Sequence, residues 1–125
     1  MVKSIYSVII AFLIFVFIGI GEQIYMEKTF EILEESYTAV YEKMQDETAN
    51  RNDVEKVKNL WLEKKKYLHF FIPHNDIKEM DLWLAEAVAY FNLDNLEEAI
   101  SKLEVAITLT RQLPKNYKIS IENIF

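Results

Sequence analysis

The chain opens with one long uninterrupted hydrophobic segment. After it, apolar residues recur every three or four positions among polar ones. Residues 4 to 21 contain no charged side chain. As a helix that rises about 1.5 Å per residue, this segment spans ~27 Å, close to the ~30 Å of a bilayer's hydrocarbon core. The pattern therefore predicts a transmembrane helix.

This segment could be retained as an anchor or removed as a signal peptide. A cleavable signal peptide has a shorter apolar region of about 7 to 15 residues, followed by a cleavage site with small residues. Here the run is longer, and its only small-x-small candidate is Gly19-Ile20-Gly21. We predict a signal anchor over residues 1–21 that stays on the protein. A cleaved and secreted helical protein is the alternative.

The charges on either side of the segment predict its orientation. Lys3 precedes it, whereas five glutamates and a single lysine lie between residues 22 and 35. The positive-inside rule places the more basic flank in the cytoplasm. We therefore predict a single-pass cell-membrane protein with a cytoplasmic N-terminus and an extracytoplasmic domain over residues 22–125. The reversed orientation stays open, because the rule counts very few basic residues here.

Beyond the segment, apolar residues recur with a helical period in four stripes. The stripes are Met26, Phe30, Leu33, Tyr37, Val40 and Met44; Val54, Val57, Leu60, Trp61, Leu68 and Phe71; Ile77, Met80, Leu84, Ala87 or Val88 and Phe91; and Leu96, Ile100, Leu103 and Ile107. Neither proline nor glycine separates Gly21 from the first stripe. The first helix is therefore expected to leave the membrane without a break, as a rigid stalk.

Polar residues predict where the later helices begin and end. Three pairs spaced as in a capping box are Asn52 with Glu55, Asp76 with Glu79, and Asp94 with Glu97. Pro73 is expected to end the second helix, because residues before proline avoid the helical backbone. Short connections make neighbouring helices antiparallel. The sequence predicts an all-α fold in which an N-terminal transmembrane helix precedes a small antiparallel bundle of two αα-hairpins.

Composition narrows the classes of function. The chain has no cysteine, which excludes a disulfide framework, a thiolate metal site and a lipidated cysteine. All 20 acidic residues but only 13 of the 14 basic residues follow the segment, which gives the domain a net charge of −7. Such a surface repels phosphate backbones, so nucleic acid is not an expected partner. The basic run of residues 64–66 is interpreted as a solvated helix face.

The two histidines are the only side chains that suggest metal or acid–base chemistry. His69 and His74 are followed by Asp76 and Glu79, and imidazole with carboxylate is what zinc or a general base requires. The histidines are five residues apart with Pro73 between them, which does not match the spacing of ligand pairs on a helix. We predict no catalytic, metal or cofactor-binding residues. A small envelope metal-binding protein or hydrolase around His69 and His74 is the alternative.

Three features of the sequence also match a known family. These are the N-terminal membrane segment, the turn "FFIPHNDI" in mid-chain, and "LP" followed by a closing "IENIF". With them the chain resembles small bacterial membrane-anchored proteins grouped as domain of unknown function 4363. The most distinctive positions are His74, Asp76, Ile77, Asn123, Ile124 and Phe125, our candidate interaction or structural motif. Asn75 stands where the resemblance implies an acidic residue.

The resemblance implies a membrane partner but no assigned activity. Such proteins are found mainly in Gram-positive endospore formers, and their genes often neighbour those of integral membrane proteins of the YetF type. Aromatic residues make up 14% of the chain, more than a small core must absorb, and Ile121, Ile124 and Phe125 make the C-terminus apolar. We therefore expect a membrane-tethered helical interaction module, an accessory subunit of an envelope or integral membrane protein. We expect it not to be an enzyme.

Overall fold

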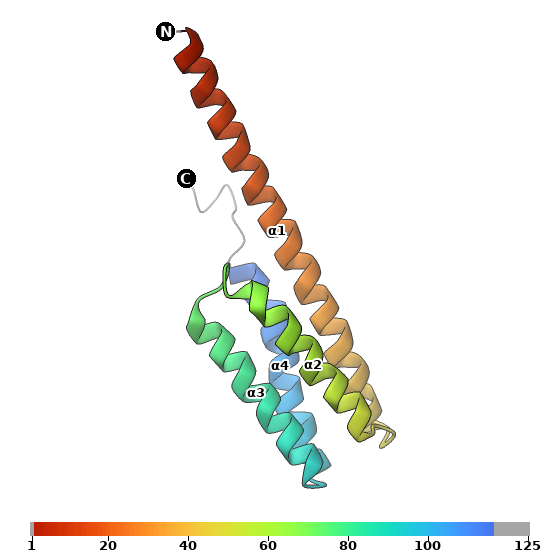
Figure 1. The fold of residues 1–125 in the computed structure, drawn as a ribbon. Coiled ribbons are helices and arrows are strands. Elements are labelled where there is room, and N and C mark those ends of the chain that lie inside the picture. The colour runs from red at the N-terminus through yellow and green to blue at the C-terminus, as the bar shows by residue number, and fades with distance from the viewer. Residues whose placement is uncertain (1, 117–125) are drawn as a thin grey trace.

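The chain folds into four helices, as a computed structural model that describes residues 2–116 shows (Figure 1). The helices are α1 (Val2–Gln45), α2 (Arg51–Leu68), α3 (His74–Asn92) and α4 (Leu96–Asn116). The described part of the chain contains no strand. The predicted all-α fold is confirmed.

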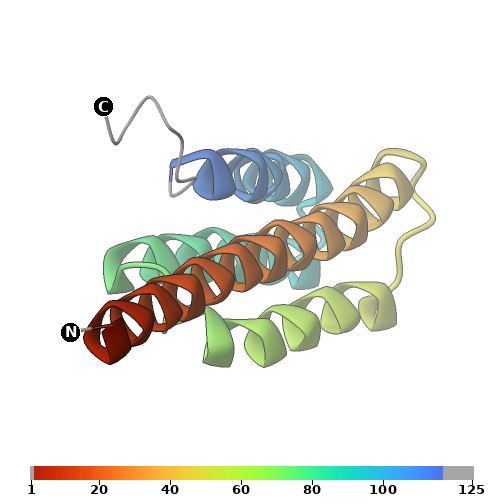
Figure 2. The same ribbon diagram turned by 90° about the horizontal axis from the view of Figure 1, so that it is seen from above.

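The four helices form a ring in which each runs antiparallel to the next (Figures 1 and 2). Helix α1 packs against α2 and α4, and α3 packs against the same two helices from the opposite side. A salt bridge of 2.7 Å from Arg111 Nε to Glu34 Oε1 adds a polar contact between α4 and α1. The predicted antiparallel bundle is confirmed, and its helices run alternately up and down.

Helix α1 is twice as long as the others because it contains both the apolar segment and the first bundle helix. Its N-terminal half projects beyond the bundle (Figure 1), and none of the residues in its most apolar 18-residue window is buried. By length and composition this half can cross a membrane, and a signal sequence can have the same length and composition. From Met26 onward the same helix contributes buried side chains to the core.

The core contains most residues of the predicted stripes, and on the second to fourth helices a few of them, Leu60, Phe71, Phe91, Leu96 and Ile100, are only half-buried. All six predicted residues of the α1 stripe are buried. On α4, Leu103 and Ile107 are buried as predicted, and Ala99 and Ala106, which were not predicted, are fully buried beside them in the core. The buried face of α4 is therefore wider than the prediction and includes two alanines. Small alanines allow the backbones to approach closely, which a search for large apolar residues overlooks.

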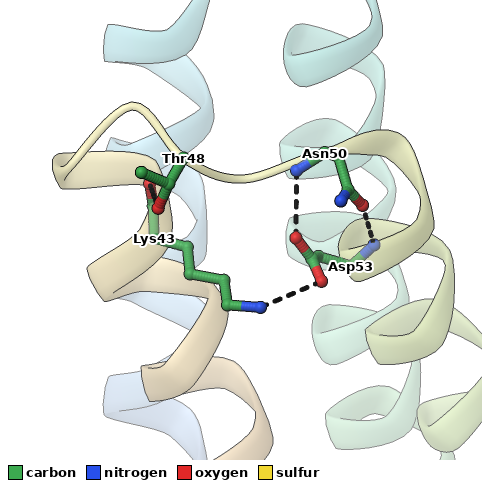
Figure 3. A network of polar contacts seen from close by, with 4 residues as sticks. All are labelled: Lys43, Thr48, Asn50 and Asp53. Carbon is green, nitrogen blue, oxygen red and sulfur yellow. Dashed lines mark hydrogen bonds and ion pairs between the residues drawn. The ribbon is translucent and has the colours of Figure 1, made fainter.

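Helix α2 begins two residues earlier than the predicted cap at Asn52 and Glu55. Asn50 Oδ1 accepts a 2.9 Å hydrogen bond from the Asp53 N–H, and Asp53 Oδ2 accepts one of 3.0 Å from the Asn50 N–H. Asp53 also lies 3.1 Å from Lys43 Nζ on α1 (Figure 3). This reciprocal capping box satisfies two backbone donors and ties the start of α2 to the end of α1.

The predicted caps of α3 and α4 are also displaced. Helix α3 begins at His74 after Pro73, so Asp76 lies in its first turn instead of capping it. Helix α4 is capped by Asn95, whose Oδ1 accepts a 3.4 Å hydrogen bond from the Glu98 N–H. Asp94 adopts a left-handed backbone with φ of 60°, a conformation that ends the preceding helix.

Candidate interaction site

The turn between α2 and α3 lies at the end of the bundle from which α1 projects (Figure 1). It brings together His69 and His74, whose rings stack with centroids 5.7 Å apart. The sequence spacing suggested that these imidazoles were poorly placed to act together, and the turn makes them neighbours. No group of three or more histidine, cysteine or acidic residues that could hold a metal is found within residues 2–116.

The predicted motif residues near this turn have different environments. His74 is exposed at the first position of α3, and Asp76 is half-buried in the same turn. An acidic side chain there interacts favourably with the positive end of the helix dipole. Ile77 is fully buried and belongs to the core. The other motif residues, Asn123, Ile124 and Phe125, lie outside the described residues, as does Ile121.

Aromatic side chains of the same turn reach the α1 helix where it leaves the bundle. The rings of Phe71 and Tyr25 are in contact, with centroids 5.7 Å apart. These two residues, with Tyr67 and Phe70, line an open hollow of about 460 Å³ that Glu63 and Lys64 border. Its mixed lining of rings and charged groups is typical of a binding surface, and no nucleophile is paired with a base in it.

A second hollow of about 430 Å³ lies between α2 and α3, and we call it the α2–α3 groove. Its lining is mainly apolar: Trp61, Leu62, Leu84, Ala85, Val88 and Ala89, with Lys58, Asp81 and Asn92 also present. Ala85 and Ala89 are exposed and lie one helical turn apart. Two small residues at this spacing leave room for the backbone of another helix.

Asp81 forms a polar cluster at the edge of this groove. Its Oδ1 accepts hydrogen bonds from Trp61 Nε1 at 2.5 Å and from Lys65 Nζ at 3.2 Å, so it joins α3 to α2. Burial raises the pKa of the Tyr37 hydroxyl on α1, and the negative charge of Asp81 raises it further. Lys65 balances the negative charge of Asp81, and the hydrogen bonds of Trp61 and Lys65 to this carboxylate hold α2 and α3 together. We call these three residues the Asp81 clamp.

The sequence reasoning missed the Asp81 cluster. The available signal was the spacing of Trp61 and Lys65, which lie four residues apart and so point the same way from α2. Their shared partner is 20 positions from Trp61, and only the packing of α2 on α3 brings it close.

One comparison with known proteins gives a match. The profile of the family described as Domain of unknown function (DUF4363) matches residues 21–124, beginning where the apolar segment ends. No curated protein and no solved structure matches the chain.

Proposed function

This chain belongs to the DUF4363 family, and we propose that it is a membrane-tethered helical interaction module that serves as an accessory subunit of another membrane protein. In this proposal α1 is retained as a single-pass anchor, with the N-terminus in the cytoplasm and the bundle outside it. The protein binds and positions its partner and catalyses no reaction.

The observation that carries this proposal is the continuity of α1. One unbroken helix contains the exposed apolar half and the buried stripe from Met26 to Met44. A continuous helix transmits orientation, so the bundle is held at a fixed height and angle relative to the apolar half. A flexible linker in the same place would leave the bundle free to change its orientation relative to the apolar half.

The α2–α3 groove supplies the surface for the partner. Its apolar lining and the small residues Ala85 and Ala89 favour an amphipathic helix as the bound element. The groove lies between α2, which runs antiparallel to α1, and α3, which runs parallel to it. A partner helix that rises from the same membrane would therefore lie alongside both. An integral membrane protein, such as the YetF type that the family resemblance implies, is the proposed partner.

Capture of the partner in native membranes tests this proposal. The tagged full-length chain is crosslinked and purified, and the captured membrane protein is identified by mass spectrometry. Ala85→Arg places a long charged side chain in the groove and should reduce capture at least tenfold. Ala39→Arg is the matched control, because Ala39 is also an exposed alanine and lies on α1. Equal capture by both variants would remove the groove from the proposal.

The C-terminal motif is tested in the same assay. A chain that ends at Ser120 lacks Ile121, Asn123, Ile124 and Phe125. If these residues dock on the partner, the shortened chain should capture less of it while keeping its helical content. Undiminished capture would show that the tail has no part in the interaction.

A further inference from the structure

The most exposed large apolar side chain that the structure describes lies in the α2–α3 turn. Phe70 is 81% exposed, and Tyr67, one turn earlier on α2, is 57% exposed. The neighbouring Phe71 and Ile72 turn inward, where Phe71 is half-buried and Ile72 is buried. The bundle therefore does not use the two outer rings for its own stability.

The contact between Phe71 and Tyr25 fixes the height of this turn relative to the apolar segment. Tyr25 lies four residues after Gly21, where the uncharged run ends. In a continuous helix this places Tyr25 ~6 Å beyond the end of the run. The headgroup layer on each side of a bilayer is about 5 to 8 Å thick. The turn that touches Tyr25 is therefore level with the lipid headgroups.

The chemistry of the turn fits that layer. Tyrosine and tryptophan are enriched at membrane interfaces because their rings are apolar and their polar ends remain hydrated, and phenylalanine adds apolar area to such surfaces. Lys64 and Glu63 line the same hollow as the rings, and Lys66 is next to Tyr67 in the sequence. Because charges of both signs are present, the rings are the common attractive element, and a neutral lipid surface is sufficient.

We propose that the α2–α3 turn inserts Phe70 and Tyr67 into the headgroup layer of the membrane that α1 spans. This inference rests on the proposed membrane anchor and adds a second attachment to it. A single helix leaves the bundle free to rotate about the helix axis and to change its tilt. Two attachments fix both motions, and they determine which way the α2–α3 groove faces above the membrane.

Site-directed spin labelling of the full-length chain in phosphatidylcholine vesicles tests this insertion. The chain contains no cysteine, so a single introduced cysteine can be labelled without background. His69→Cys places the label in the turn while keeping both rings, and His69 is exposed. Phe12→Cys reports on the apolar segment, and Leu93→Cys reports on the opposite end of the bundle, where Leu93 is 74% exposed.

The measured quantity is the accessibility of each label to oxygen, which concentrates in lipid, relative to a nickel chelate, which stays in water. We expect the ratio to be highest at position 12, intermediate at position 69 and lowest at position 93. In the double variant Tyr67→Ser, Phe70→Ser the ratio at position 69 should fall to that at position 93. Both replaced side chains are largely exposed, so the bundle should remain folded, which circular dichroism checks.

Several results would overturn the inference. A label at position 69 that is as water-accessible as position 93, while position 12 reports lipid, removes the insertion and leaves the anchor in place. A water-accessible label at position 12 removes the anchor itself, and the inference with it. Protection of position 69 from both reagents would indicate a protein contact instead of lipid. Insertion that requires anionic phosphatidylglycerol would assign the attachment to the lysines.

Discussion

The indole of Trp61 donates a 2.5 Å hydrogen bond from Nε1 to Oδ1 of Asp81, so that a core residue of α2 is tied to a half-buried carboxylate on α3. Lys65 Nζ lies 3.2 Å from both carboxylate oxygens and balances their charge. The pair lies at the edge of the α2–α3 groove. It therefore links the stability of the bundle to the surface that we propose for the partner.

Removing this carboxylate should destabilise the bundle. Asp81→Ala leaves the buried indole N–H without its acceptor, and we expect a loss of about 1–3 kcal/mol in the free energy of unfolding. The measurement is urea unfolding of the full chain in detergent, followed by circular dichroism. Glu86→Ala is the control, because Glu86 is half-buried like Asp81 but its partner Lys102 lies 3.8 Å away, and so loose a pair should contribute only about 0–1 kcal/mol. Equal losses in both variants would contradict the clamp.

The observed capping box predicts a difference between two neighbouring asparagines. Asn50→Ala removes the side chain that accepts from the Asp53 N–H and should cost ~0.5–2 kcal/mol. Asn52→Ala lies inside the exposed first turn and should be neutral or slightly stabilising, because alanine favours helix. Unfolding measurements on both variants decide between the two positions. A larger loss at Asn52 would mean that the helix begins where the sequence pattern predicted.

Asp53 should make the bundle less stable in acid. The N–H of Asn50 lowers the pKa of Asp53 below its ordinary value of 3.8, and the hydrogen bond from Lys43 lowers it further. This stabilisation is complete above the ordinary value and is lost as the pH falls through the lowered one. Unfolding measured from about pH 6 down to about pH 2 should show a smaller acid loss in Asp53→Asn than in the wild type. Identical acid profiles would show that the contact makes no difference to folding.

Tyr37 should make the bundle sensitive to alkali. Its side chain is fully buried, and burial raises the pKa of its hydroxyl above the ordinary value of 10.0. The unfolded chain therefore ionises first, so stability is complete below that value and falls as the pH rises above it. Tyr37→Phe should flatten this decline, which urea unfolding at increasing alkaline pH measures. An unchanged decline in Tyr37→Phe would exclude Tyr37 as its cause.

The sequence predicted the number of helices, their antiparallel order and the buried stripe of α1. These features depend on hydrophobic period and on connection length, which a single sequence displays directly. The match to the DUF4363 family confirms the resemblance that the terminal segments and the "FFIPHNDI" turn suggested. The boundary between an anchor over residues 1–21 and a domain over residues 22–125 stays a prediction, and so does the role of the C-terminal motif.

The sequence did not predict the details that depend on competition or on tertiary contact. Two overlapping residue pairs, Asn50 with Asp53 and Asn52 with Glu55, have the spacing of a capping box. The first pair forms the cap, and its Asp53 also accepts a hydrogen bond from Lys43 on α1. Ala99 and Ala106 were missed on α4 because they carry no large side chain that marks them as core residues. Spacing along a helix could not describe His69 and His74, since a turn brings them together.

The central claim is that α1 stays on the protein and holds it in the membrane. The most direct test is the intact mass of the chain, with a C-terminal tag, recovered from membranes after an alkaline carbonate wash. We predict an uncleaved chain of about 14.8 kDa plus the tag in the washed membrane fraction. A chain shortened by its first 21 residues and recovered from the medium would contradict the claim and identify the apolar segment as a cleaved signal peptide.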